Sequence, residues 1–533
     1  MKNRHKKPND NVKKIINKGY SQSGASISKR AFKGFDVKSG SANEDINYNN
    51  DKLRQRSRTM LMSGGIALSA INTNRTNVIG TGLYPKSRID REYLGMDSKE
   101  AEIWQKNTER EFSLWANRKR ACDATGINDF YSMQSLALIS WLASGDSFCV
   151  FKRYPTDTMF PYSLRLHIVE ADRISTPGSL NGALPKMTDG KGKNGNRIFD
   201  GVEVNENGLI EAYHIRNNYP NEINAPATKW ARVLAYGKET GLPNILQIMN
   251  TERPDQYRGV PYLAPVLEQL LQTRRYTESE LMAAVVESFY TAFITTNNDA
   301  DEIPFNEAIA EDQGTVSDDD NEYEMGPGTT ITLKPGENVT FGDPKRPSGG
   351  FEAFIRAISV QIGAALEIPA DLLLKEFNAS YSASRAALLE AWKAFKTRRK
   401  WFVSDFCEPI YETWMYEAVA LGRIQAPGFF DNPLIRQAYL GCTWIGPSQG
   451  MLDPTKEISA EVMACQYGLS TYSDSATRLN GSDWDANIER LKTETEKLTE
   501  ITVKSPEVEA LIQEAVKEGV KEEKENASDS DKK

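Results

Sequence analysis

The longest helix that the sequence predicts runs from about Ser384 to Leu421, and only Pro409 interrupts it. At ~1.5 Å per residue, an element of this length spans roughly 50 Å. Proline has no backbone N–H and its ring clashes with the preceding turn, so we expect a kink there. With 533 residues, the length predicts either three or four domains or one elongated molecule with several lobes.

Two further helical patterns bracket a short segment with β-strand character. The first helix is expected over roughly 264–290, and the second follows the glycine pair 349–350 and stops before Pro369. Between them, TTITL (329–333) and NVTF (338–341) indicate short strands. The second helix carries an apolar stripe formed by Phe354, Ile355, Ile358 and Ile362. A lone subunit would cover this stripe only partly, so we expect a closed oligomer with the stripe near subunit or helix contacts.

The rest of the chain predicts a mixed region and a helical end. Residues 1–50 hold too few apolar side chains to offset the entropy of ordering, so we predict a disordered basic arm. Helices are expected over about 51–71, 97–121 and 130–143, and again from Asp453 onward. Strands are expected at the following four segments: 147–154, 164–171, 201–204 and 211–217.

Charge is distributed unevenly along the chain. Residues 1–58 hold 15 Lys and Arg against 5 Asp and Glu, whereas the whole chain has a net charge of −8. Residues 299–324 contain eleven Asp and Glu and no Lys or Arg. That segment creates a strongly negative local field. Three adjacent carboxylates within it, Asp318, Asp319 and Asp320, are weak candidates for a metal site, because no glycine-assisted turn or EF-hand spacing accompanies them.

Composition and motifs exclude several classes of function. No apolar stretch reaches the roughly 18 residues that span a bilayer, and no apolar segment follows the basic N-terminus of a would-be secretory signal. Five widely spaced cysteines without a C-x-x-C pair predict buried thiols in a reducing compartment. Three histidines are few for a metal centre, and the phosphate-binding pattern G-x-x-x-x-G-K-[ST] is absent. We therefore expect no catalytic residue, no metal and no cofactor.

One basic run leaves two interpretations open. KAFKTRRK (393–400) places five basic side chains within eight residues of the long helix. They either contact phosphate or form a solvated, salt-bridged helix face, and we favour the second.

Several separated motifs resemble the lambda-type family of tailed-phage portal proteins. The most recognisable stretch is ERPDQYRGVPYLAPVLEQLLQTRRYTESELMAA (252–284). The other motifs follow in the order of the family: 56–83, 167–175, 327–341, 378–393, 453–471 and 480–485. The resemblance covers about residues 51–492 and does not extend to the basic arm or the Lys/Glu-rich tail.

The resemblance implies an α+β, mainly helical fold made of wing, stem, clip and crown. The parts it implies, after the disordered basic arm (1–50), are a mixed α/β wing (51–263), a first stem helix (264–293), a β-containing clip (294–348), a second stem helix (349–368), a channel loop (369–383), the long kinked wing helix (384–450), and a crown with a Lys/Glu-rich tail (451–533). In this picture the stripe on the second helix packs the stem.

The resemblance also implies a function without catalysis. A ring of twelve subunits at one capsid vertex would pass double-stranded DNA, without sequence specificity, during packaging and ejection. The implied partners are the terminase large subunit, a head-completion or connector protein, and the major capsid or scaffold protein; the implied location is the virion, after assembly in the host cytoplasm. The alternatives are a metal-dependent nuclease built on the acids and a partner-binding hub that forms no ring.

Two sets of site residues follow from the resemblance. The channel-loop candidates are Lys375, Asn378, Tyr381 and Ser382. The candidates for the clip and for terminase docking are Asp318, Asp319, Asp320, Glu322 and Glu324. These acids would either line the channel, where negative walls keep DNA from sticking, or dock a basic face of a partner.

Overall fold

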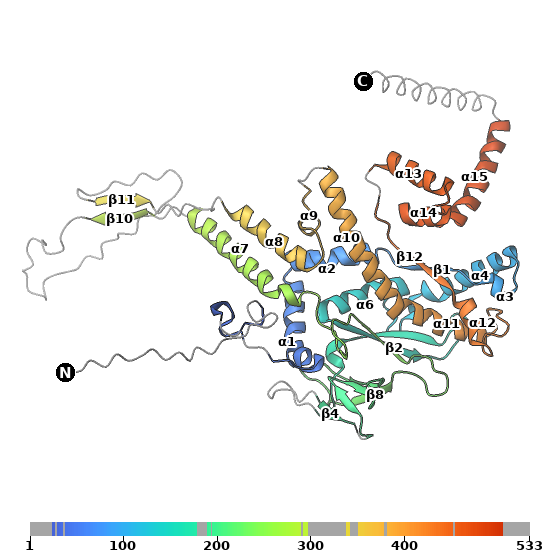
Figure 1. Ribbon diagram of the computed structural model, residues 1–533, viewed down its shortest axis with the longest axis horizontal. Helices are drawn as coiled ribbons and strands as arrows, with labels where there is room; N and C mark the ends of the chain where they lie inside the picture. Colours follow the sequence, from blue (N-terminus) through green and yellow to red (C-terminus); the bar gives the residue numbers. More distant parts are fainter. Residues whose placement is uncertain are drawn as a thin grey trace, which may run out of the picture.

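The structure is a computed structural model that describes most of the chain. The described residues are 24–26, 29–35, 38–178, 189–192, 194–288, 292–296, 337–341, 350–377, 381–450 and 453–504. The fold is α+β and mainly helical, as expected. Figure 1 shows a central body from which one pair of helices and one C-terminal helical arm project.

Helices form one side of the body. They are α1 (Ala42–Met62), α2 (Gly65–Val78), α3 (Arg91–Leu94), α4 (Ser98–Ala116), α5 (Lys119–Cys122), α6 (Phe130–Ser144) and α12 (Pro433–Leu440). The expected helices 97–121 and 130–143 thus correspond to α4 with α5 and to α6. Asp97 and Asp129 begin α4 and α6, because each carboxylate accepts a hydrogen bond from a backbone N–H of the first turn.

Antiparallel sheets form the other side of the body. A three-stranded sheet has the order β3-β2-β9, made of β2 (Asp146–Arg153), β3 (Leu164–Glu170) and β9 (Ile245–Met249). A five-stranded sheet runs β4-β5-β6-β7-β8. Its strands are β4 (Asp189–Lys191), β5 (Arg197–Phe199), β6 (Val202–Val204), β7 (Ile210–Arg216) and β8 (Trp230–Leu234). β1 (Tyr84–Ser87) pairs with β12 (Cys442–Ile445). The four strands expected in this part of the chain are present, as β2, β3, β6 and β7.

The N-terminal helix starts earlier than the sequence analysis predicted. α1 begins at Ala42 rather than near Asp51, and Ser41 and Glu44 form a reciprocal capping box at its start. Asn43 and Asn50 donate their side-chain amides to the backbone carbonyls of Asp255 and Gly259. Residues 42–50 are therefore helical and packed against the body, so the arm predicted as disordered cannot extend to residue 50.

The long helix of the sequence analysis is present but is interrupted in an unexpected way. α10 (Tyr381–Phe402) passes into a π-helical turn, Val403–Cys407, and then into α11 (Glu408–Ala420), with Pro409 in the first turn of α11. Proline offers no N–H to the carbonyl four residues before it, and a π turn widens the backbone at that point. The interruption predicted at Pro409 thus takes the form of a π turn immediately before it.

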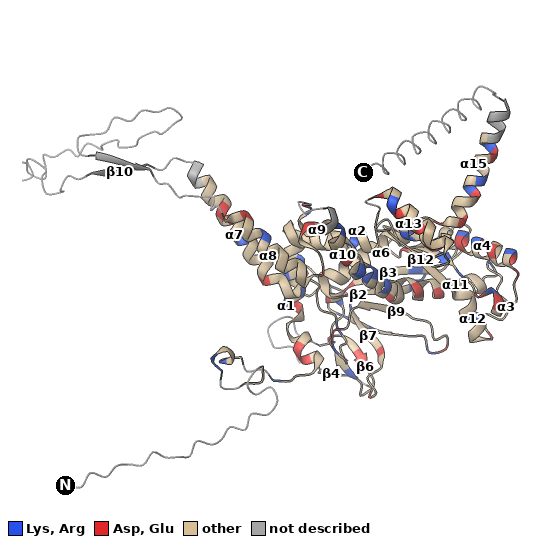
Figure 2. Cartoon of the chain, turned by 45° about the horizontal axis from the view of Figure 1, so that its top comes forward, with Lys and Arg blue, Asp and Glu red and all other residues tan. Residues whose placement is uncertain are grey.

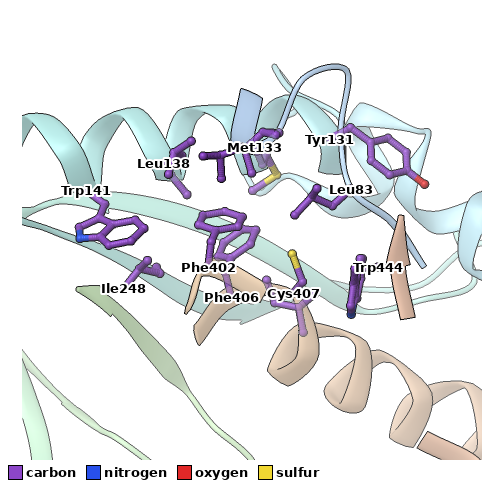
Figure 3. Close-up of a cluster of buried hydrophobic side chains, with 14 of the residues drawn as sticks. Leu83, Tyr131, Met133, Leu138, Trp141, Ile248, Phe402, Phe406, Cys407 and Trp444 are labelled. Atoms are coloured by element: carbon purple, nitrogen blue, oxygen red, sulfur yellow. The ribbon is translucent and has the colours of Figure 1, made fainter. Parts of the chain in front are cut away.

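The last residue of α10 and the π turn after it place aromatic side chains in the centre of the core. Phe402 and Phe406 are fully buried, and Figure 3 shows them below α6 between Trp141, Leu138 and Ile248. Their ring centroids lie 5.1 Å apart. The core therefore joins α6, the three-stranded sheet and the long helix in one cluster.

Asp405 lies in the same π turn and allows a test by pH. Burial raises the pKa of this carboxyl to about 6. Because the folded pKa is raised, the folded state holds the proton more tightly, and stability present below about pH 4 is lost as the pH rises to about 6. We expect Asp405→Asn to raise the unfolding free energy by about 1–2 kcal/mol at pH 8, since partial exposure reduces the full effect, and to change it little at pH 4. Denaturant titrations of the wild-type protein and the variant at both pH values check this. The substitution Asp431→Asn, at an exposed position, is the control, and its effect on the free energy of unfolding should be small at both pH values.

Two helices project from the body as an antiparallel pair (Figure 1). They are α7 (Leu267–Ser288) and α8 (Phe351–Ala365). Beyond them lies an antiparallel pair of strands, β10 (Ala292–Thr296) and β11 (Glu337–Phe341), in which Ala292 pairs with Phe341. The predicted pattern of two helices around a β-containing module is therefore present. The predicted boundary at 293 falls inside β10, because α7 already ends at Ser288. The expected strand 329–333 lies outside the described residues.

The C-terminal arm is helical, as predicted from Asp453 onward. It consists of α13 (Pro454–Gln466), α14 (Tyr472–Asn480) and α15 (Trp484–Lys504). Ion pairs attach it to the body: Lys86 pairs with Asp483, and Lys106 pairs with Glu489. Figure 2 shows basic and acidic residues mixed along α15.

Candidate functional site

The projecting helices pack through one aromatic cluster. The ring of Tyr276 on α7 lies 5.0 Å from Phe354 and 5.5 Å from Phe351, centroid to centroid. Of the four residues predicted to pack the stem, Ile362 is fully buried, Ile355 and Ile358 are half-buried, and Phe354 is 48% exposed despite its contact with Tyr276. The stripe therefore runs from the core of the body out to a surface that this chain covers only partly.

A tight corner turns α8 into α9 (Ala370–Leu374). A Cβ on Gly363 would lie 2.4 Å from the carbonyl oxygen of Ile368, so only glycine fits there. Glu367 adopts a left-handed conformation with φ of 55°. Leu366 and Ile368 are both buried. The corner thus fixes the direction in which the following segment, predicted as the channel loop, leaves the helix pair.

The channel-loop candidates do not all project freely. Lys375 ends α9 in a left-handed conformation, and its Nζ donates a hydrogen bond of 2.8 Å to the Thr73 hydroxyl on α2. Burial lowers the pKa of this ammonium group. Asn378 lies outside the described residues. Tyr381 and Ser382 form the start of α10, and their side chains also lie outside the described part.

Arg398 of α10 holds the corner in place. Its guanidinium donates to Asn74 Oδ1 at 2.8 Å, to the Leu366 carbonyl at 3.3 Å and to the Glu367 carboxylate at 2.6 Å. It also lies 4.9 Å from the centroid of the Tyr262 ring, just before α7. One buried side chain therefore links α2, the approach to α7, the end of α8 and α10.

The role of Arg398 was not predicted from the sequence. The basic run 393–400 divides between two faces: Lys393, Lys396 and Lys400 are exposed, whereas Arg398 is buried. Neither a phosphate site nor a solvated face describes the run as a whole. The available signal was helical spacing, because Arg398 falls three residues after Phe395 and four before Phe402, on the apolar side of α10.

The next residue of the run has a similar structural role. Arg399 donates to the backbone carbonyls of Asn77, Val78 and Pro447 at 2.7–2.9 Å. Burial lowers the pKa of this guanidinium to about 10. Two of these carbonyls belong to the last turn of α2 and the third follows β12, so Arg399 joins α10 to α2 and to the segment after β12.

A second buried arginine holds the mixed part of the body together. Arg258 is fully buried and pairs with Asp146 at 2.6 Å and with Asp200 at 2.7 Å. It also donates to the carbonyls of Ala171 and Ile174, both at 3.0 Å. The motif 252–284 that carries the resemblance thus includes Arg258, a buried residue that links the two main sheets.

The other site predictions have simpler outcomes. The acidic candidates Asp318, Asp319, Asp320, Glu322 and Glu324 lie outside the described residues. Within the described ranges, no group of three or more His, Cys, Asp or Glu is arranged to hold a metal ion. No helix in that part of the chain is long and apolar enough to cross a membrane. All five cysteines are free thiols; three are buried and two are half-buried.

Comparisons with known proteins agree on one family. The family described as phage portal protein, lambda family, matches residues 28–399. Portal protein B of Escherichia phage lambda is 22% identical over 450 residues, covering 80% of each chain. The portal protein of Escherichia phage N15 is 22% identical over 472 residues, covering 85% of each chain. The probable portal protein of Halomonas phage phiHAP-1 is 24% identical and covers 89% of this chain and 85% of its own.

Solved structures similar to this chain include one described as the neck of a native GTA particle with C12 symmetry. The TM-score is 0.40 at 12% identity, with coverage of 81% of this chain and 94% of that one. The neck of the empty GTA particle gives a TM-score of 0.41 at 13% identity, with coverage of 80% and 92%.

Proposed function

The chain belongs to the lambda family of phage portal proteins, and from that premise we propose that twelve copies close into a ring whose channel passes double-stranded DNA. The family is a structural one, and its members are components of the virion. We infer a ring at one capsid vertex, assembled in the host cytoplasm, that conducts DNA without sequence specificity and without catalysis.

One observation carries this proposal: the family match spans the helix pair, the corner after it and most of α10. The geometry supports it, because α7 and α8 project from the body with apolar side chains left partly uncovered. A closed ring requires two different surfaces on each subunit that recognise one another. Uncovered apolar surface on a projecting pair is suited to such contacts.

Electron microscopy of the purified full-length protein tests the ring. Twelve copies of 59.7 kDa give a particle of about 716 kDa, with a central channel visible in end views. A monodisperse monomer at micromolar concentration would overturn the proposal and favour the hub alternative. Cleavage of DNA that depends on Mg²⁺ would instead favour the nuclease alternative.

We further propose that the ring docks the terminase large subunit, a head-completion or connector protein, and the major capsid or scaffold protein. The acidic segment 299–324 is the candidate for terminase docking. It holds eleven carboxylates and few large apolar residues, which suggests an exposed excursion. Complementary charge across an interface mainly accelerates association. The same acids could instead line the channel and repel DNA.

Neutralising five acids separates these placements. We expect the variant that replaces Asp318, Asp319, Asp320, Glu322 and Glu324 with Asn or Gln to assemble normally and to package DNA poorly. If the segment docks terminase, binding measurements should give slower association with unchanged DNA retention. If it lines the channel, DNA retention should rise at low salt and return to normal as salt shortens the Debye length to about 8–10 Å. No change in either measurement would leave the segment with only a solubilising role.

A further inference from the structure

α8 has a second apolar surface besides the one that contacts α7. A groove of about 580 Å³ lies between α8, α9 and α10. Its lining includes the small residues Gly363, Ala364, Ala391 and Ala394, and Val360 stands at its edge with half of its side chain exposed. A largely apolar hollow of this size on a protein surface is a candidate interaction site.

The groove and the contact with α7 lie on opposite sides of α8. An α-helix turns by about 100° per residue. Phe354, which contacts Tyr276 of α7, therefore falls on one side, and Val360, Gly363 and Ala364 fall on the other. The α7 of the same chain leaves the groove uncovered.

α7 likewise has one side that contacts α8 and an opposite side that does not. Tyr276 faces α8, whereas Leu271, Leu281 and Met282 lie away from it by the same helical geometry. Leu281 is 65% exposed and Met282 is 62% exposed. Covering large apolar side chains with another surface removes them from water and lowers the free energy.

We propose that the exposed side of α7 in one copy lies in the groove between α8, α9 and α10 of the neighbouring copy. This inference rests on the proposed ring and specifies its interface. The two surfaces are different and occupy opposite sides of one two-helix layer, so each copy offers a helix to one neighbour and a groove to the other. Such a head-to-tail contact closes into a ring when the rotation between copies fits.

Both surfaces also carry charges. Glu367 and Glu390 line the groove beside their own ion-pair partners, Arg398 and Lys393. On α7, Arg274 pairs with Glu278, and Arg275 is exposed among the apolar residues. The carboxylates of Glu367 and Glu390 remain largely exposed, so Arg275 of a docked α7 can approach them.

Cysteine cross-linking tests the interface in the full-length protein. The double variant Met282→Cys with Ala394→Cys, treated with a short bismaleimide, is expected to give a ladder of covalent multimers on a denaturing gel. A mixture of the two single variants, assembled together, should give dimers but no longer products. Each copy then carries only one of the two introduced cysteines, so it can be cross-linked to only one neighbour. Each single variant alone controls for the native cysteines. Leu209→Cys with Ala394→Cys is the matched control. Leu209 is 65% exposed, close to the 62% of Met282, but it lies in the body and not on α7.

Filling the groove gives a second measurement. Ala394→Trp is expected to reduce the fraction of protein in rings about tenfold, whereas Lys396→Trp, on the exposed side of α10, should leave it unchanged. Rings that form without any cross-link in the double variant would overturn this interface while the ring itself stands. A wild-type protein that stays monomeric would overturn the proposed ring and this interface together.

Discussion

Replacing Arg258 with alanine is expected to lower the free energy of unfolding by about 3–5 kcal/mol, the largest effect of any single substitution proposed for this protein. The guanidinium is fully buried and balances two carboxylates, Asp146 and Asp200, that are themselves almost fully buried. Its removal leaves Asp146 without its arginine partner in a region of low dielectric, while Asp200 keeps its pair with Arg54. It also removes the donors to the carbonyls of Ala171 and Ile174.

An exposed arginine from the same motif provides the control for this experiment. Arg253 pairs with Asp45, and both side chains are about half exposed. Such a pair contributes about 0–1 kcal/mol, so Arg253→Ala should have a small effect. Denaturant unfolding at one fixed protein concentration measures both variants, because assembly stabilises the folded state by mass action. Equal losses in the two variants would contradict the role given to Arg258.

Replacing Arg398 with alanine is expected to cost about 2–4 kcal/mol and to loosen the corner between α8 and α9. The buried acceptors Asn74 Oδ1 and the Leu366 carbonyl lose a charged donor. The cost is smaller than for Arg258 because the carboxylate partner, Glu367, is largely exposed and regains water. Amide hydrogen exchange should become faster over residues 363–375, which follow the lost contact.

Two further substitutions serve as controls for Arg398→Ala. Lys393→Ala removes an exposed charge from the same helix. This charge pairs with the equally exposed Glu390, so the substitution should change stability by less than about 0.5 kcal/mol. Arg398→Lys keeps the charge but loses the planar fork that reaches several acceptors, so it should restore only part of the stability. If exchange over 363–375 stays at the wild-type rate in Arg398→Ala, the corner does not depend on this residue.

Much of the secondary structure was determined by local sequence. α4, α6, α8 and the strands β2, β3 and β7 lie close to their predicted ranges, because their apolar periodicity and N-caps act within one or two turns. The interruption of the long helix could likewise be predicted, since Pro409 lacks an N–H wherever the chain folds. The order of two helices around a β-containing module follows from the same local signals.

Other features depended on residues far apart in the chain. The start of α1 was missed because its buried side carries asparagines that bond to residues 255 and 259, about 210 positions away, instead of an apolar stripe. Its capping box, Ser41 with Glu44, was the local signal available.

The burial of charge was decided only by tertiary structure. Arg258 meets Asp146 across 112 positions, and Arg398 meets Asn74 across 324. A sequence shows that an arginine is charged, but its environment depends on which distant carboxylates and carbonyls the fold brings to it. Because an unpaired charge is costly inside a protein and a paired one is tolerated, only the assembled fold determines whether such a residue faces water or the core.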